Sequence, residues 1–380
     1  MERWRKIRLG DFCVTNADSY SPREEWGFVN YLDTGNITNN TIDSIQYIDI
    51  KNEKLPSRAR RKVKRNSIIY STVRPNQRHF GIIKSQPENF LVSTGFAVID
   101  VNTNVLDADF LYYLLTQDAL VEALHAIAEQ STSAYPSIKP SDLENLEIEI
   151  PDLDTQRKIA DVLSSLDRKI TQNTDVNENL ADLLQTIYQE RFSDVSLASV
   201  QGNLSDLCTY FKDRVPISQL NASTYFSTEN MLPGKAGATE ATSLPTTQQT
   251  TACHKGDTLI SNIRPYFKKI VYCADECGCS TDVLCFTPTQ SQYAAYLFST
   301  LYADKFFAFM VAGSKGTKMP RGDKQQIMSY PVALPSNEEL GEFNDLALPI
   351  LTQIHSNRSE NKRFSAVRDS LLPKLMAFTE

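Results

Sequence analysis

The sequence predicts a mixed α/β protein of the α+β class. Two globular domains are joined by a pair of long antiparallel coiled-coil helices, and an internal pseudo-twofold repeat relates the halves. Two nineteen-residue stretches share one pattern: a proline at the fourth position, a basic residue near the middle, a short apolar alternation and a closing proline. They are "SAYPSIKPSDLENLEIEIP" at 133–151 and "TKMPRGDKQQIMSYPVALP" at 317–335. Strand-like and helical runs precede each copy, and apolar residues at heptad spacing follow it. These observations together predict the fold class.

Length and composition limit the class of protein. A chain of 380 residues with 41% hydrophobic content can fill two ordinary domains. It contains no apolar run long enough for a membrane helix, and "MERWRKIRLGDF" at the N-terminus lacks the apolar core of a signal peptide. Seven cysteines without a secretion signal indicate reduced thiols. We therefore expect a cytoplasmic protein with no membrane partner.

The repeat extends through each half. "RLGDFC" at 8–13 matches "NLSDLC" at 203–208, "NSIIYSTVRP" at 66–75 matches "GDTLISNIRP" at 256–265, and "STGFAVI" at 93–99 matches "STDVLCF" at 280–286. The offsets fall from 195 to 190, 187 and finally 184, as expected if the second copy is shortened. We therefore predict a first domain at 1–151, a first helix at 152–196, a second domain at 197–335 and a second helix at 336–380.

A heptad pattern follows each copy of the nineteen-residue stretch. In the first half the spacing of four and three is sustained from Ile159 to Ile187, and it predicts a coiled-coil helix over about 152–192. A heptad stripe is too narrow to be buried against a compact domain, so we expect the two helices to pair with each other. Pro349 and Pro373 predict a kink or a broken start in the second helix.

Two asparagines recur at the same seam positions of both helices. In an antiparallel pair, Asn173 should face Asn361 and Asn177 should face Asn357, which would fix the register of the spacer. The alternative is that "NTDVNEN" at 173–179 is a frayed, water-exposed patch.

Charge is segregated along the chain, although the net charge is −7. Residues 57–84 hold nine Lys or Arg and no acid, which suits contacts to DNA phosphates but equally a solvated face. "RPNQRH" at 74–79 offers side chains that read base edges, whereas the "RP" shared by both copies is also explained by a turn after a strand. The predicted DNA-binding residues are Arg58, Arg60, Arg61, Lys62, Lys64, Arg74, Asn76, Gln77, Arg78, His79, Tyr135, Arg264, Tyr266, Lys268, Lys269, Lys315, Lys318 and Arg321.

The two-copy plan and "YPSIKPSDLENLEIEIPDLDTQRKIADVLSSLDRKI" at 135–170 resemble the DNA-specificity subunit of type I restriction-modification systems. The motif is an apolar alternation, then Pro151, Gln156 and an amphipathic helix that includes Ile159. The second copy departs from it, because Leu340 stands where Gln is expected. The resemblance covers nearly the whole chain and implies two target-recognition domains, each followed by a conserved spacer helix.

The resemblance also implies a function and partners. Such a subunit is not catalytic and selects a bipartite asymmetric sequence in double-stranded DNA. It binds methyltransferase subunits, and two of them are expected. Through these it also binds the restriction and translocase subunits.

Other functions remain as alternatives. A tandem RNA-binding or protein-binding adaptor would share the plan, and it is favoured if the basic residues are scattered over the surface. A self-sufficient nuclease or methyltransferase would need a carboxylate cluster or a cofactor loop, and the sequence has neither a G-x-x-x-x-G-K-[ST] nor a G-x-G-x-x-G motif. The sequence therefore predicts no cofactor.

A cysteine-rich segment raises the question of a metal site. Cys273, Cys277, Cys279 and Cys285 could bind zinc, but their spacing is not that of paired C-x-x-C motifs. The matching first-half segment has no cysteine. We therefore predict no metal, with zinc left as the alternative.

Overall fold

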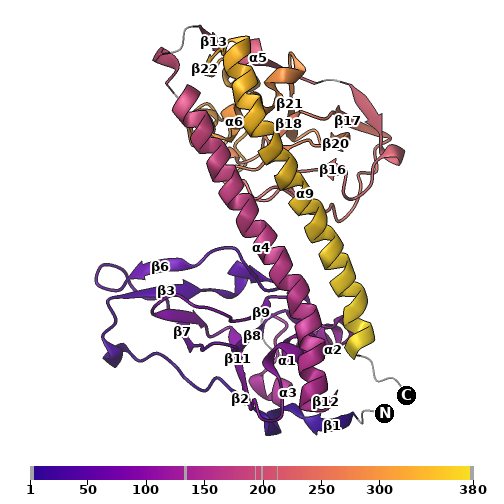
Figure 1. The fold of residues 1–380 in the computed structure, drawn as a ribbon. Coiled ribbons are helices and arrows are strands. Elements are labelled where there is room, and N and C mark those ends of the chain that lie inside the picture. The colour runs from indigo at the N-terminus through magenta and orange to yellow at the C-terminus, as the bar shows by residue number, and fades with distance from the viewer. Residues whose placement is uncertain (1–3, 132–134, 193, 198–199, 212, 377–380) are drawn as a thin grey trace. The chain divides into compact units, whose positions relative to one another are not determined.

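The structure, a computed structural model, describes residues 4–131, 135–192, 194–197, 200–211 and 213–376. Ser133 and Ala134, which begin the first nineteen-residue stretch, lie outside the described residues. The chain divides into two compact units, one of residues 1–170 with 362–380 and one of residues 171–361. Each unit combines a domain of strands and short helices with segments of two long helices (Figure 1). In the described part of the chain, no helix is long and apolar enough to cross a membrane.

The first unit is built on two four-stranded sheets. One sheet is antiparallel, with the strand order β2-β11-β8-β9. The other has the order β6-β3-β10-β7, and within it β10 runs parallel to β3 and antiparallel to β7. The strands are β2 (Cys13–Thr15), β3 (Phe28–Leu32), β6 (Gln46–Asp49), β7 (Ala59–Lys62), β8 (Ile68–Ser71), β9 (Phe80–Ile82), β10 (Phe90–Ser93) and β11 (Phe96–Val101), and β1 (Arg5–Arg8) pairs separately with β12 (Glu147–Ile150).

Short helices cover the antiparallel sheet of the first unit. The side chain of Asp107 accepts a hydrogen bond from the Phe110 N–H and so caps the first of them. Nearly all of this helix is buried among Ile68, Tyr70 and other residues of the sheet. The helices are α1 (Ala108–Leu115), α2 (Asp118–Glu129) and α3 (Pro140–Glu144).

The second unit repeats this plan. Its antiparallel sheet has the order β14-β21-β18-β19, which corresponds strand for strand to β2-β11-β8-β9. The elements are β13 (Gln201–Asn203), α5 (Leu204–Leu207), β14 (Cys208–Tyr210), β15 (Arg214–Pro216), β16 (Tyr225–Phe226), β17 (Gln249–Cys253), β18 (Thr258–Ser261), β19 (Ile270–Tyr272), β20 (Cys277–Cys279), β21 (Val283–Pro288), α6 (Ala294–Tyr302), α7 (Asp304–Ala312), α8 (Lys324–Met328) and β22 (Pro331–Ala333).

The second sheets of the two units differ at one edge. Both contain three equivalent strands, β3-β10-β7 and β16-β20-β17. The fourth strand is added beside β3 in the first unit, as β6, and beside β17 in the second, as β15. The two sheets therefore correspond in their three shared strands and differ in the position of the fourth strand.

The long helices are α4 (Leu153–Phe192) and α9 (Asn337–Met376). Both have 40 residues, and both ends are displaced by 184 positions. In the second unit α4 runs antiparallel to α9, because Asn173 contacts Asn361 whereas Arg191, further along α4, contacts Glu342. The predicted fold class is thus confirmed.

The prolines do not give the second helix a broken start, which was one of the two predicted effects. Pro349 and Pro373 both lie within α9, which is continuous. A proline in a helix frees the carbonyl four residues earlier, here at Asp345 and Asp369. Both of those residues and both prolines are exposed, so water can solvate the freed carbonyls.

The start of α4 is tied to its domain by a buried glutamine. The Gln156 side chain is fully buried, and its Oε1 accepts a hydrogen bond from the Asp107 N–H at 2.8 Å. Its Nε2 donates to the carbonyls of Val105 and Pro151. The equivalent Leu340 of α9 is instead buried in an apolar cluster. Each half therefore anchors its helix by a different interaction.

The substitution Gln156→Leu should lower the free energy of unfolding by about 2 to 3 kcal/mol. The Asp107 N–H and the carbonyls of Val105 and Pro151 would lose the side chain to which they are hydrogen-bonded. Leu340→Gln should also destabilise, since the apolar cluster offers its amide no comparable partners. Guanidinium unfolding followed by circular dichroism measures both effects, with Leu340→Met as the conservative control. Wild-type stability of Gln156→Leu would contradict the anchoring role.

Candidate nucleic-acid interface

Each domain carries an arginine loop with the same unusual backbone. The loops join β8 to β9 and β18 to β19, and each contains a short 3₁₀ turn that starts with proline. The residues that flank this turn adopt the left-handed conformation, which non-glycine residues rarely occupy and which marks functional sites when it is observed. The φ angles are 48° at Arg74, 57° at Arg78, 51° at Arg264 and 52° at Lys268.

The repeated nineteen-residue stretch holds these loops in place. The Arg74 N–H donates to the carbonyl of Pro136 at 2.9 Å, and the Arg264 N–H donates to the carbonyl of Pro320 at 2.8 Å. These prolines are the fourth residues of the two stretches. The stretch is repeated in sequence because the same loop is supported in both domains.

The tips of the two loops carry different side chains on this shared backbone. The first loop exposes Asn76 and Gln77. The second exposes Tyr266 and Phe267, which are 49% and 39% accessible. Amide side chains can form paired hydrogen bonds with a base, whereas aromatic rings offer apolar and stacking contacts.

An exposed residue beside each loop extends this surface. The Arg74 guanidinium lies 5.0 Å from the centre of the Tyr135 ring. Adding 184 to Tyr135 gives Met319, which is also exposed. Sequence reasoning missed Met319 and Phe267, although the offsets of 184 and 190 could have identified both from Tyr135 and Gln77.

The other basic residues of the first domain lie apart from the loop, in and beside the edge strand β7. Lys62 pairs with Glu24 at 2.6 Å, and Lys64 pairs with Asp100 at 3.3 Å. Burial lowers the pKa of Arg61, whose Nε has no partner among the described residues. Arg58 is exposed and Arg60 half-buried. The basic stretch therefore divides between an edge strand and the arginine loop.

Some predicted contact residues bind the protein itself. His79 Nδ1 lies 2.6 Å from the Ile37 carbonyl, and Arg78 pairs with Asp118 of α2 at 2.6 Å. In the second domain Lys268 pairs with Asp304 at 2.9 Å. Lys269 donates to the Thr228 carbonyl at 2.6 Å, and burial lowers its pKa. These side chains are directed toward their own domain.

Three basic residues follow α7 in the second domain. Lys315 pairs with Asp323, and Arg321 pairs with Asp282 at 3.1 Å. Lys318 is exposed. The backbones of Lys315 and Arg321 form a bridge, so this loop is ordered beside Pro320 and the second arginine loop.

The asparagines form the two contacts that the sequence predicts. Asn173 Nδ2 donates to Asn361 Oδ1 at 2.9 Å, and Asn357 Nδ2 donates to Asn177 Oδ1 at 2.9 Å. Residues 173–179 are helical, which excludes the frayed-patch alternative for this structure. Paired amides satisfy each other at positions where an unpaired one would destabilise.

In the first unit an ion pair joins the same two helices. Arg368 Nη1 lies 2.7 Å from Asp167 Oδ1, and the Tyr113 hydroxyl donates to the other oxygen of this carboxylate. Burial and the Asp167 charge raise the pKa of Tyr113. The equivalent pair in the second unit is Leu351 (167 + 184) with Leu184 (368 − 184), both buried. One helix contact is therefore ionic and its counterpart apolar.

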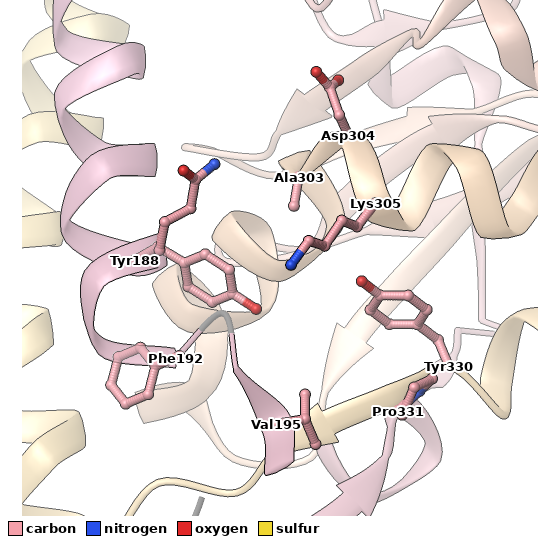
Figure 2. A pocket seen from close by; sticks show the side chains of 9 residues that line it. Tyr188, Phe192, Val195, Ala303, Asp304, Lys305, Tyr330 and Pro331 are labelled. Atoms are coloured by element: carbon pink, nitrogen blue, oxygen red, sulfur yellow. The ribbon is translucent and has the colours of Figure 1, made fainter. Parts of the chain in front are cut away.

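Each unit also has a pocket where a long helix ends. In the second unit a pocket of 170 Å³ lies between the end of α4 and the short helix α7, and Figure 2 shows Tyr188 and Phe192 on one side with Lys305 and Tyr330 on the other. The first unit has a pocket of 280 Å³ at the equivalent place, where Met376 (192 + 184) takes the position of Phe192.

The cysteine-rich segment lies in the interior of the second domain. All seven cysteines are free thiols and buried. Within the described ranges, no group of three or more His, Cys, Asp or Glu side chains has an arrangement that could hold a metal ion.

Comparisons with known proteins agree with this architecture. Residues 1–181 match a family model described as the type I restriction modification DNA specificity domain. The HindI type I restriction enzyme specificity subunit of Haemophilus influenzae is 31% identical over 194 residues, which are 51% of this chain and 42% of that protein. This chain therefore aligns with less than half of that relative. The MjaIX specificity subunit of Methanocaldococcus jannaschii is 22% identical over 411 residues, 98% of this chain and 92% of that protein.

A solved structure shows the same fold. The type I restriction-modification S subunit of M. genitalium has a TM-score of 0.59 at 15% identity, over 100% of this chain and 97% of that one. The two proteins share a fold of two α+β domains with long paired helices. Residues 1–181 match the model of the type I DNA specificity domain, and the predicted resemblance to type I specificity subunits is confirmed.

The ion pair between the long helices generates a test. Asp167→Leu should lower the unfolding free energy of the chain by about 2 kcal/mol, because Arg368 and the Tyr113 hydroxyl lose their acceptor. The double variant Asp167→Leu with Arg368→Leu should lose less unfolding free energy than the two single variants lose together, because it has leucine at both positions, as the second unit does. Thermal unfolding of the four proteins of this cycle gives the coupling. Strict additivity would show that the pair is energetically unimportant.

Proposed function

We propose that this chain is the non-catalytic DNA-specificity subunit of a type I restriction-modification complex and recognises a bipartite asymmetric sequence in double-stranded DNA. The observation that carries the proposal is the arginine loop, which occurs in both domains with the same backbone and different tip side chains. A shared backbone lets each loop approach DNA in the same way. Different tips select different bases, so the target consists of two unlike blocks.

The residues of each loop divide into two roles. Arg74 lies at the base of the first loop and carries a charge that suits a phosphate, which positions the domain without reading sequence. Asn76 and Gln77 at the tip suit paired hydrogen bonds with adenine. In the second domain Tyr266 and Phe267 suit apolar contacts with base edges, such as the thymine methyl group.

The four predicted segments have separate roles in this proposal. Residues 1–151 and 197–335 are the target-recognition domains, and residues 152–196 and 336–380 are the spacer helices. The hydrogen bonds of Asn173 with Asn361 and of Asn177 with Asn357 support a fixed register, because a slipped seam would set amides against apolar residues. A fixed register in turn fixes the gap between the two DNA blocks.

The partners in this proposal are two methyltransferase subunits, and through them restriction and translocase subunits. Both long helices expose apolar side chains at equivalent positions, Val162 with Leu346 and Leu183 with Val367, each 45–49% accessible. The two pockets are also equivalent. A surface that occurs twice on one chain suits two copies of one partner.

The test is selection from a pool of random duplexes by the purified chain, followed by mapping of methylated bases after co-expression with the methyltransferase subunit of the same system. Both readouts should give the same two unlike blocks separated by an unspecific gap. A single block, a palindrome or a preference for RNA would overturn the proposal, and RNA preference would favour the adaptor alternative.

Substitutions in the first loop should separate the two roles. Arg74→Gly keeps the left-handed backbone and removes the charge, so it should weaken binding to all sequences and reduce the salt slope by about one unit. Asn76→Ala with Gln77→Ala should instead relax the first block, with a loss of about 1 to 3 kcal/mol of discrimination per base contact. Fluorescence anisotropy across a salt series and against block variants measures both. Lys84→Ala, outside the loop and paired with Asp109, is the control.

The length of the helices should set the gap. One heptad inserted after Lys169, with another after Ser365 in the facing part of α9, adds about 10 Å to the pair. That length equals about three base pairs, so the selected gap should widen by about three while both blocks stay the same. Repeating the duplex selection with this variant measures the change. An unchanged gap would contradict the spacer role.

A further inference from the structure

Five of the seven cysteines share one cluster between the two sheets of the second domain. The segments that supply them are β17, the end of β19, β20 and β21. None is more than 6% accessible, and the cluster also contains Met231, Leu259, Val271 and Val283. The five are Cys253, Cys273, Cys277, Cys279 and Cys285.

The repeat shows that the fold does not require thiols here. The matching cluster of the first domain contains aliphatic and aromatic residues and no cysteine. An offset of 190 relates Cys253 and Cys273 to Val63 and Ile83, and an offset of 187 relates the other three to Phe90, Val92 and Val98. Every one of the five cysteines thus replaces an ordinary core residue of the sister domain. The second domain therefore has a cluster of thiols where the first has hydrocarbon side chains.

Two of these thiols are in contact. The Sγ atoms of Cys273 and Cys277 lie 3.5 Å apart, on either side of the turn between β19 and β20. Cys253 is the direct cross-strand neighbour of Cys277 in the pairing of β17 with β20. A disulfide has a sulfur separation of about 2.05 Å, so small side-chain rotations would bring the first two sulfurs within bonding distance.

The neighbouring thiols change the acidity of Cys277. Interactions with the side chains of Cys253 and Cys273 lower the pKa of Cys277. The same interactions raise the pKa values of Cys253 and Cys273. The thiolate is the nucleophile in cysteine oxidation, and the lowered pKa favours Cys277 as that thiolate.

We propose that Cys273 and Cys277 are a thiol oxidation site that hydrogen peroxide converts to a disulfide. The Cys277 thiolate attacks one peroxide oxygen, the O–O bond breaks, and Cys277 becomes a sulfenic acid while hydroxide leaves. The Cys273 sulfur then attacks the Cys277 sulfur and displaces the hydroxyl group, which leaves as water with the Cys273 proton. In sum, two thiols and one peroxide give one disulfide and two waters. A dithiol reductant reverses the reaction.

The position of this site connects it to the second arginine loop. Cys273 directly follows β19, and β19 is the strand that leaves the loop. A disulfide would tie the end of this strand to the start of β20. The chemical proposal does not depend on the proposed DNA-binding function, because its test counts free thiols.

The experiment treats the folded, full-length chain with a small excess of hydrogen peroxide. Titration of thiols in denaturant should then show a loss of two from the seven, with a mass decrease of about 2 Da. Digestion without reductant should give one cross-linked species, from the segment that contains Cys273 and Cys277. Dithiothreitol should restore all seven thiols.

Variants provide the controls. Cys277→Val and Cys273→Val should each abolish the disulfide, and two independent variants guard against a folding defect in one, which circular dichroism would detect. Cys279→Val, which copies Val92 of the first domain, should still form it. The proposal is overturned if the folded chain keeps seven thiols, if the disulfide maps to another pair or persists in Cys277→Val, or if the purified protein holds stoichiometric zinc on these thiols.

Discussion

The structure depends on one constraint, which is that neither long helix can bury its apolar stripe alone. The stripe of α4 follows a strict heptad and is narrower than the face of an ordinary globular helix. In the second unit it is covered by α9 and by the domain together, because Tyr188 and Phe192 pack against Phe343 of α9 and against Tyr296 of α6. Helix pairing and domain packing are therefore one cooperative structure within this unit. The amide pairs of the second unit and the ion pair of the first add polar contacts to the apolar contacts between α4 and α9.

Duplication explains how one architecture carries two different surfaces. The parts that repeat most closely are buried or strained: the antiparallel sheet, the left-handed residues of the arginine loop and the proline carbonyl that supports it. The parts that differ are loop tips and sheet borders, such as β6 and β15. The two copies thus share the backbone that supports the loop and differ in the side chains exposed on it.

Much of this organisation could be predicted from the sequence. The helix expected over 152–192 is α4 at Leu153–Phe192, because a sustained heptad is an unambiguous signal. The asparagine pairs followed from their recurrence at one offset. Both predictions used only the spacing of residues along the chain, which can be read from a single sequence.

The remainder required three-dimensional information. The prolines were expected to kink α9 or to break its start, but their effect depends on whether the freed carbonyls reach water. His79 is one of the predicted DNA contacts, and the sequence does not show that its ring nitrogen lies beside the carbonyl of Ile37, which is distant in sequence. The partners of Arg78 and Lys268 are also contributed by distant helices. Composition identifies a basic segment, but it does not tell which of its charges are already neutralised.

The unequal helix contacts have a consequence for how genes of this kind can recombine. If two copies of α4 paired in the register of the native helices, Asp167 would face Leu184 and its charge would have no partner; two copies of α9 would likewise set Arg368 against Leu351. The two helices are thus complementary rather than interchangeable, and self-association of either one is disfavoured. A recombination event that exchanges whole domains but leaves both helices in place preserves this complementarity. Each domain can then be replaced while α4 and α9 keep their complementary contacts.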